Sequence, residues 1–372
     1  MSANLGALSD LCTPWCIRVV ATLRIAELLA DAESTAETGR TTDADNTAAA
    51  DRTTAGEGDG SGPAHADAAA DIDTTVGIDD LAAAAGCDPD VLYRVLSHLV
   101  TKGVFDQPTP GRFAINETAR ALLDPGTHLF LDLDGIGGRM AHAWSTLLKA
   151  VRTGEPAYHE LFGRPFWEDL DAHPDVAASF DDLMGPAGHG TPDTDILVTG
   201  DWDSVRTVVD VGGGTGALLA EILRTHPHIH ASLVDLPRTV ARADSTFRSA
   251  GVADRVTTHG QSFFDLLPGK ADLYLLMSIL NDWPDREAVA ILQRCGEAAH
   301  PHGRVLIVGG VSDGAGRSAA LIPETVLMGG KDRRLTDFGE LARAAGLEVH
   351  ATRHLPTGRL AVECRPHDPE GQ

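Results

Sequence analysis

The chain has 372 residues, 43 % of them hydrophobic and 23 % charged, which allows two globular domains that each bury a core. Its formal net charge of −24 would repel nucleic-acid phosphates, so we expect no nucleic-acid partner. No apolar run reaches the ~20 residues that a membrane helix needs, and the five scattered cysteines are typical of reduced thiols, so we expect a cytoplasmic protein without a membrane partner.

The N-terminal part of the chain contains two kinds of sequence. Apolar side chains recur at helical spacing over residues 5–32, with an interruption at Pro14. Residues 33–75 lose this pattern: Ala, Thr, Asp and Gly dominate, and Ile72 is the one large apolar side chain. Because such a segment buries too little surface to offset its ordering entropy, we expect residues 33–75 to be a disordered acidic insertion.

A helix, a second helix and a hairpin are predicted after the insertion. The first helix covers Leu81–Ala85 with Asp79 as its candidate N-cap, and the second covers Val91–Lys102 with Asp88 as its N-cap. Two short strands follow around a Pro-Thr-Pro-Gly turn, ending near residue 115. This order is that of a winged helix, but the second helix has only one Arg and one Lys for phosphates, so we expect residues 1–115 to form a packing or dimerisation domain.

The remainder of the chain changes from helices alone to strands alternating with helices. Residues 116–200 are predicted to be a helical linker that contributes to a substrate pocket. Beyond residue 201, the pattern predicts helices over 217–225 and 240–250 and strands at 208–211, 231–236, 256–258, 271–277 and 304–308. The alternation predicts an α/β, Rossmann-like domain over 201–372, in which a parallel sheet has helices on both faces.

A glycine-rich turn joins the first strand of this domain to its first helix. The segment is Asp210-Val211-Gly212-Gly213-Gly214-Thr215-Gly216, and glycines allow a backbone to approach a ligand closely. The next strand ends in Asp235, at the place where such folds usually bind ribose hydroxyls. The turn therefore predicts a nucleotide-like cofactor beyond the carboxyl ends of the strands.

The identity of the cofactor follows from the form of this turn. A dinucleotide is the alternative, but its fingerprint spaces the glycines as G-x-G-x-x-G. Here four glycines cluster behind an acid, Asp210, and the motif starts in the middle of the chain after a helical region. These features favour S-adenosylmethionine, with Asp210 binding the ammonium group directly or through water.

The motifs together resemble a known family. The glycine turn followed by Leu280-Asn281-Asp282-Trp283-Pro284-Asp285 resembles the small-molecule O-methyltransferases related to caffeate and hydroxyindole methyltransferases. The segments 11–24, 151–158 and Gly163-Arg164-Pro165-Phe166-Trp167 resemble its actinomycete branch, which acts on anthracyclines and other aromatic polyketides. That branch includes carminomycin 4-O-methyltransferase and aclacinomycin 10-hydroxylase. The resemblance covers nearly the whole chain except residues 33–75.

The resemblance implies a class I methyltransferase fold, a homodimer formed by the N-terminal helices, and roles for several residues. Arg164 would hold the cofactor carboxylate, and Asp235 the ribose hydroxyls. Ser262 stands where the family usually has an acid beside the adenine. The cofactor-binding set implied in this way is Arg164, Asp210, Gly212, Gly214, Asp235, Ser262, Phe263 and Ser278.

The chain departs from the family at the catalytic position. Where plant-like members have a histidine base, this chain has Asn281, and an amide cannot accept a proton. We therefore expect Asn281 to orient the acceptor hydroxyl and consider Asp282 as a base. Methyl transfer to a hydroxyl of an aromatic polyketide or similar metabolite is the main hypothesis. The alternatives are hydroxylation, decarboxylation, cyclisation or rearrangement with the same cofactor, and a non-catalytic ligand-binding regulator.

Further residues are candidates for the substrate site or for metal binding. The resemblance implies a substrate pocket formed by Met140, Trp144, Phe166, Trp167, Met184, Asn281 and Met328. His142 and His189 are alternative bases. The cluster His226-Pro227-His228-Ile229-His230 has no acid or Cys at ligand spacing, and Cys12 and Cys16 are interpreted as core thiols, so we expect no metal.

Overall fold

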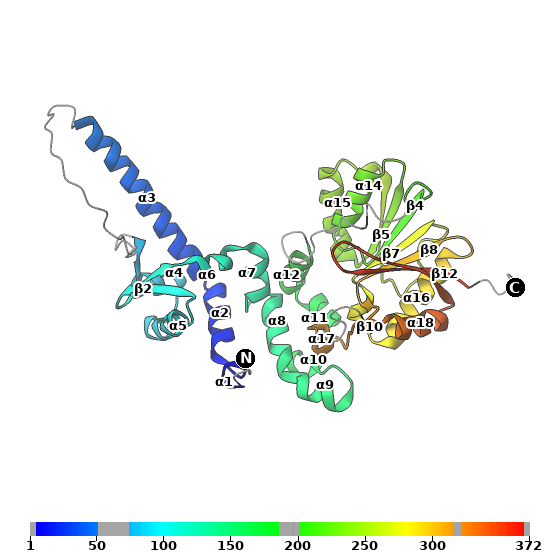
Figure 1. The fold of residues 1–372 in the computed structure, drawn as a ribbon, viewed down its shortest axis with the longest axis horizontal. Helices are drawn as coiled ribbons and strands as arrows, with labels where there is room; N and C mark the ends of the chain where they lie inside the picture. Colours follow the sequence, from blue (N-terminus) through cyan, green and yellow to red (C-terminus); the bar gives the residue numbers. More distant parts are fainter. Residues whose placement is uncertain (1–4, 51–73, 186–195, 197–200, 315–320, 368–372) are drawn as a thin grey trace. The chain divides into compact units, whose positions relative to one another are not determined.

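The computed structural model describes residues 5–50, 74–185, 196, 201–314 and 321–367. The chain divides into two compact units, Met1–Gly137 and Gly138–Gln372 (Figure 1). Each unit contains its own hydrophobic core. The division falls inside the stretch 116–200 that the sequence assigns to a linker.

Helices and a small antiparallel sheet form the N-terminal unit. Its core is built from apolar side chains one helical turn apart, such as Ile25 with Leu29 and Leu92 with Leu96, packed on Phe113. The sheet has the strand order β1-β3-β2. The elements are α1 (Leu5–Leu8), α2 (Cys12–Thr22), α3 (Ile25–Ala50), β1 (Val76–Gly77), α4 (Ile78–Ala85), α5 (Pro89–Thr101), β2 (Phe105–Thr109), β3 (Arg112–Ile115), α6 (Glu117–Arg120) and α7 (Pro125–Leu131).

The predictions for this unit are confirmed in part. The side chain of Asp88 accepts a hydrogen bond from the amide of Val91 at 2.9 Å and caps α5 as predicted. Asp79 is not a cap, because α4 begins one residue before it and has Gly77 as its N-cap. Pro14 does not interrupt a helix: it lies in the first turn of α2, where its missing N–H has no intrahelical partner to lose.

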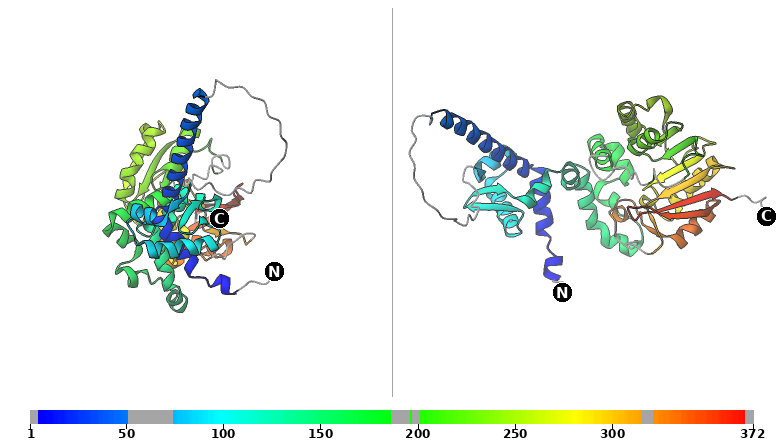
Figure 2. Two further views of the ribbon diagram at one scale, coloured as in Figure 1. Left: turned by 90° about the vertical axis from the view of Figure 1, so that its left-hand side faces the viewer. Right: turned by 45° about the horizontal axis from the view of Figure 1, so that its top comes forward.

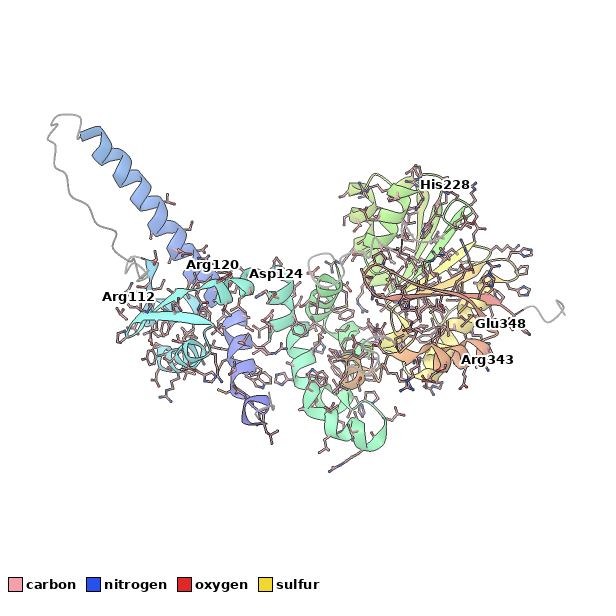
Figure 3. All side chains as sticks on the ribbon, viewed as in Figure 1. Arg112, Arg120, Asp124, His228, Arg343 and Glu348 are labelled. Atoms are coloured by element: carbon pink, nitrogen blue, oxygen red, sulfur yellow. The ribbon has the colours of Figure 1, made fainter. Side chains whose placement is uncertain are left out.

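The expected disorder is wrong for residues 33–50, because α3 continues to Ala50. Alanine has the highest helix propensity, and Glu33 of this helix forms an ion pair with Arg120 of α6 at 2.5 Å (Figure 3). Residues 51–73 of the predicted insertion lie outside the described residues. Thr75 is the last residue of the predicted insertion, and its hydroxyl accepts a hydrogen bond from Arg112 Nε of β3 at 2.8 Å.

The C-terminal unit consists of a helical segment followed by a seven-stranded sheet. The helical segment contains α8 (Ile136–Ala143), α9 (Leu147–Thr153), α10 (Tyr158–Phe162), α11 (Phe166–Ala172) and α12 (Pro174–Met184). The sheet has the order β11-β12-β8-β7-β4-β5-β6, and its strands are β4 (Thr207–Val211), β5 (His230–Asp235), β6 (Val256–Gly260), β7 (Leu273–Met277), β8 (Arg304–Val308), β11 (Leu347–His354) and β12 (Leu360–Pro366). The strands from β8 to β6 are parallel, as predicted, whereas β12 is antiparallel to both of its neighbours.

Helices cover both faces of this sheet (Figures 1 and 2). Successive residues of β7 point to opposite faces: Leu275 packs with α14 (Ala217–Thr225) and α15 (Pro237–Ser249), and Leu276 packs with α16 (Asp285–Ala299) and α18 (Leu335–Ala344). Because both faces are covered, the central strands are apolar at nearly every position. Within the part of the chain that the structure describes, no helix is long and apolar enough to span a membrane.

A buried ionic network organises the helical segment of the C-terminal unit. Asp169 of α11 is fully buried and accepts a hydrogen bond from the Tyr158 hydroxyl at 2.6 Å. Arg139 of α8 forms an ion pair with the same carboxylate at 3.2 Å, and His173 approaches it at 3.0 Å. The Asp169 carboxylate therefore connects α8, α10 and α11.

We expect Asp169→Ala to lower the free energy of unfolding by about 3–5 kcal/mol, because it leaves Arg139 and the Tyr158 hydroxyl without their buried partner. The matched control is Asp171→Ala, two residues along the same helix, whose exposed carboxylate pairs with Arg238 at the surface. Chemical denaturation of both variants measures the difference. Equal destabilisation of the two would contradict the role given to Asp169.

Candidate active site

The glycine turn leaves the carboxyl end of β4 in a conformation that requires glycine. Gly212, Gly214 and Gly216 have φ angles of +75°, +61° and +79°. A Cβ at Gly212 would lie 2.5 Å from Ile279 Cδ1, whereas one at Gly214 would meet nothing within 4 Å. The turn is thus packed on Ile279, in the loop after β7, at Gly212 and is open at Gly214, where a ligand can approach the backbone.

Asp235 connects this turn to the end of β5. Its carboxylate accepts hydrogen bonds from the amides of Gly214 at 2.8 Å and Leu236 at 2.7 Å. Burial raises the pKa of Asp235, and the two amide donors oppose that rise. The predicted ribose-binding acid therefore lies directly beside the glycine turn.

Asp210 is a buried carboxylate without a partner. Its side chain is 1 % exposed, and neither oxygen has a hydrogen-bond partner among the described residues. A Cβ on Gly213 would lie 2.3 Å from Asp210 Oδ2, so the carboxylate sits against the glycine backbone. Burial, with a smaller contribution from Asp235, raises its pKa to about 7. A carboxylate left unpaired beneath an open glycine turn fits a cofactor with a cationic ammonium group.

The other predicted cofactor-binding residues differ from one another in exposure and in hydrogen bonding. Arg164 lies between α10 and α11, is exposed, and forms no ion pair with any residue that the structure describes. The Ser262 hydroxyl accepts a hydrogen bond from the amide of Phe264 at 3.2 Å, while Phe263 borders Gly212. Ser278 has a φ of +55°, rare for a side chain of this type, and its hydroxyl accepts a hydrogen bond from Arg359. Its hydroxyl is therefore held in place.

The amide of Asn281 has a fixed orientation after β7. Its Nδ2 donates to Asp282 Oδ1 at 2.9 Å, and its Oδ1 is buried with no partner in the described part of the chain. Burial, followed by the charge of Glu324, raises the pKa of Asp282 well above its usual range. Asp282 therefore holds the amide, and Asn281 Oδ1, which has no partner among the described residues, can accept a hydrogen bond from a hydroxyl group.

Arg333 holds the loop that carries Asn281, a role that the sequence analysis missed. Its guanidinium is 3 % exposed and donates to the carbonyl oxygens of Leu280 and Trp283, each at 2.6 Å. It also pairs with Asp285 at 3.0 Å. Arg333 belongs to β10 (Arg333–Arg334), which pairs with β9 (Val311–Ser312). Nothing in the sequence distinguishes it from a surface arginine.

Glycines bring two other segments close to this loop. A Cβ at Gly310 would lie 3.0 Å from the Asn281 amide nitrogen, and one at Gly330 would lie 2.1 Å from the Asn281 carbonyl oxygen. Gly309 and Gly310 follow β8 (Arg304–Val308) and both have positive φ angles. Here they permit close contact of backbones, which a side chain would prevent.

Aromatic side chains from separate segments pack around Trp283. Trp167 of α11 stacks on it with ring centroids 6.0 Å apart, and Phe263 and Phe264 approach it edge-on. Phe166 is buried among Tyr158, Trp167 and Phe180, which gives it a packing role. Among the other predicted substrate residues, Met140 is buried, Met184 is exposed, and the half-buried ones are Trp144, Trp167, Asn281 and Met328.

The histidines considered from the sequence have ordinary surroundings where they are described. His142 is exposed at the end of α8, and His189 lies outside the described residues. His226 stacks on Trp202, and His228, before β5, contacts the Trp202 carbonyl oxygen (Figure 3). The described residues place no acid or Cys with them in a group of three metal ligands.

Comparisons with known proteins agree with this geometry. Residues 144–348 match the model of the O-methyltransferase domain family. The chain is 36 % identical over 356 residues to 2,7-dihydroxy-5-methyl-1-naphthoate 7-O-methyltransferase of Streptomyces carzinostaticus, covering 94 % of this chain and 93 % of that protein. It is 37 % identical over 296 residues to aclacinomycin 10-hydroxylase RdmB of Streptomyces purpurascens, covering 74 % and 78 % of the two chains.

A solved structure has the same fold. It is an O-methyltransferase (NcsB1) from neocarzinostatin biosynthesis, in complex with S-adenosylmethionine and 2-hydroxy-5-methyl naphthoic acid, with a TM-score of 0.81 and 34 % identity over 98 % of this chain and 99 % of that one. The fold is that of a class I, S-adenosylmethionine-dependent methyltransferase. The chain belongs to the O-methyltransferase family, as the motifs predicted.

We expect Arg333→Met to lower kcat/KM by about 100-fold, because losing three buried contacts displaces the loop that carries Asn281. Arg334→Met is the control, since Arg334 is exposed on the same strand. Steady-state kinetics, measured with the affinity for S-adenosylhomocysteine, separate a displaced loop from a lost cofactor site. Near-normal turnover in a folded Arg333→Met protein would show that Arg333 is not needed to hold the Asn281 loop in position.

We expect Asp210→Asn to stabilise the protein more at pH 8 than at pH 5, by up to about 3 kcal/mol. The folded-state pKa, about 7, lies above the unfolded value, so the ionised carboxylate destabilises the fold above pH 7 and this penalty declines as the pH falls. The same variant should lose affinity for S-adenosylhomocysteine. Denaturation and calorimetry at both pH values, with exposed Asp244→Asn as control, test the two effects.

Proposed function

We propose that this protein transfers a methyl group from S-adenosylmethionine to a phenolic hydroxyl of a polycyclic aromatic secondary metabolite. The observation that carries the proposal is the buried Oδ1 of Asn281, which has no partner among the described residues and is held on a loop after β7 in the same unit as the glycine turn. The relatives support the substrate class: one is named for a hydroxylated naphthoate, another for mitomycin biosynthesis and a third for O-demethylpuromycin.

The chain supplies groups that match each part of the cofactor. We assign the ammonium to Asp210, the ribose hydroxyls to Asp235 and the carboxylate to Arg164, whose guanidinium is exposed and unpaired among the described residues. The backbone at Gly212 and Gly214, together with Ser262, Phe263 and Ser278, completes the proposed set. Bound there, the cofactor supplies an electrophilic methyl group on a sulfonium.

Positioning of the acceptor is the task that remains for the protein. The acceptor hydroxyl donates a hydrogen bond to Asn281 Oδ1, and Asp282 keeps that amide from rotating. Because Asp282 Oδ1 accepts a hydrogen bond from the Asn281 amide, we assign Asp282 a positioning role; burial also raises its pKa well above the usual range. A phenol next to a quinone or carbonyl is already acidic, and orientation alone can supply ~7–11 kcal/mol.

The acceptor is aromatic, and the loop is bordered by aromatic side chains. Trp167 and Trp283 are half-buried and stacked, and Trp167 Nε1 has no hydrogen-bond partner in the described residues. With Trp144, Met140, Met184 and Met328 they form our proposed substrate contacts. Flat apolar surfaces of this kind favour polycyclic ligands over small polar ones.

Chemistry other than methyl transfer is the second candidate. The observation that favours it is the 37 % identity to aclacinomycin 10-hydroxylase, combined with an amide where a histidine base is expected. In that case the same residues would bind the cofactor without consuming it.

We also propose that the protein acts in the cytoplasm as a homodimer formed by the N-terminal unit. Leu5 and Leu11 are 78 % and 79 % exposed, at and just before the first helices, and such apolar exposure is typical of association surfaces. Light scattering should give twice the chain mass. Leu11→Asp should shift the protein toward the monomer, and exposed Leu266→Asp in the other unit should not.

Methyl-labelled S-adenosylmethionine and a panel of aromatic polyketides test the reaction directly. Methyl transfer predicts a product heavier by the labelled methyl, with S-adenosylhomocysteine formed in equal amount. A changed substrate with intact cofactor would establish the second candidate, and no cofactor binding would reject both.

Substitutions at Asn281 test the positioning role. We expect Asn281→Ala to lower kcat/KM by about 10- to 100-fold through loss of one buried hydrogen bond. Asn281→His should add a new limb near pH 6.5 to the pH–rate profile, because it supplies a base that the wild-type loop lacks. The control is Gln293→Ala, an exposed amide on α16. Unchanged kcat/KM in Asn281→Ala would remove Asn281 from the reaction.

A further inference from the structure

Three side chains with metal-binding atoms meet in the N-terminal unit. Cys12 and Cys16 lie one turn apart on α2, and His98 comes from α5. The two sulfur atoms and a ring nitrogen of His98 all lie within 4.8 Å of one another, which makes this the one such group of three among the described residues. The sequence suggested only two core thiols, because His98 is brought to them by the packing of α2 on α5.

The spacing of the two sulfurs matches a tetrahedral metal site. Cys12 Sγ and Cys16 Sγ are 3.8 Å apart. Two thiolates that bind Zn²⁺ at ~2.3 Å with a tetrahedral angle lie about 3.8 Å apart, so the two sulfur atoms already have the spacing that such a site requires. Cys16 is buried and Cys12 is exposed, so the fourth position of a tetrahedron is left for water.

A hydrogen-bonded chain sets the tautomer of His98. The Thr13 hydroxyl donates its only hydrogen to Asp10 Oδ2 at 2.6 Å, since a carboxylate only accepts. The contact of 2.8 Å between Thr13 Oγ1 and His98 Nε2 therefore has Nε2–H as the donor. Nδ1 is then the nitrogen of the neutral ring that has a free lone pair. This arrangement of ring, outer partner and carboxylate is typical of metal-binding histidines.

The surrounding charges also fit a divalent cation. Asp10 forms an ion pair with Lys102 at 3.0 Å and accepts a hydrogen bond from the Thr13 hydroxyl at 2.6 Å. Two thiolates and the Asp10 carboxylate are offset in charge by Lys102 and a divalent ion, so the site as a whole is neutral.

We propose that Cys12, Cys16 and His98 form a zinc site that joins α2 to α5, with Thr13 and Asp10 as its outer support. Binding replaces the two thiol protons with one Zn²⁺ and releases those protons to solvent. The site lies in the N-terminal unit, and the role we propose for it is structural.

The test uses the full chain, reduced and freed of metal with a chelator. Zn²⁺ is titrated against a chromophoric chelator, and Co²⁺ is used as a spectroscopic probe. We expect one equivalent of Zn²⁺ with a Kd of about 1 μM or lower, a rise in Tm on binding, and a Co²⁺ spectrum with a thiolate charge-transfer band and strong tetrahedral d–d bands. A protein that takes up no Zn²⁺, or Co²⁺ bound without thiolate, overturns the proposal.

Substitutions identify the ligands. Cys16→Ser and His98→Gln should abolish the Zn²⁺-dependent rise in Tm, and Thr13→Val should weaken Zn²⁺ binding about 10- to 100-fold by releasing the imidazole. Cys87→Ser is the matched control, a free cysteine of the same unit outside the cluster. Circular dichroism of the metal-free variants shows whether each is folded. If folded His98→Gln binds Zn²⁺ like wild type, the ion is adventitious only and the proposal fails.

Discussion

The active unit depends on one constraint, the absence of side chains at the turn after β4. Without Cβ atoms, Gly212 packs on Ile279 and Gly213 packs on the Asp210 carboxylate, while Gly214 donates its amide to Asp235. The ends of two strands are thereby joined around a buried acid that has no partner of its own among the described residues. The fold tolerates this unfavourable charge because the same acid is available to a cationic ligand.

The second half of the site is held by a residue far from it in sequence. Arg333 binds the carbonyl oxygens of Leu280 and Trp283, and the glycines at 310 and 330 allow their segments to approach the same loop. Asn281 and Asp282 then lie on a well-supported loop, with the Asn281 amide oriented by the Asp282 carboxyl group. A loop held in this way is suited to orienting the acceptor hydroxyl. Orientation is the contribution that Asn281 can make, because an amide, unlike a histidine, cannot accept the proton.

Patterns with a local physical cause were predictable. The helix Ala217–Thr225 and the strand Arg304–Val308 have the predicted bounds, and Asp88 caps α5, because apolar periodicity and capping act over a few residues. Alanine propensity was underestimated in α3, and the antiparallel strands β11 and β12 were not predicted, because their pairing is decided by distant partners. The surroundings of the proposed substrate residues could not be predicted either: Phe166 is buried among other aromatic side chains, whereas Met184 is exposed.

The sequence by itself determined the class of protein: the alternation of strands and helices, the glycine turn with its acids and the Asn281 motif are all contiguous segments. Only the tertiary structure decided which distant side chains share an environment. It put Arg333 on the Asn281 loop, left Asp210 without a partner among the described residues, and brought His98 to Cys12 and Cys16. The physical reason is that burial and hydrogen bonding depend on neighbours in space, and a residue's neighbours in space are not its neighbours in sequence.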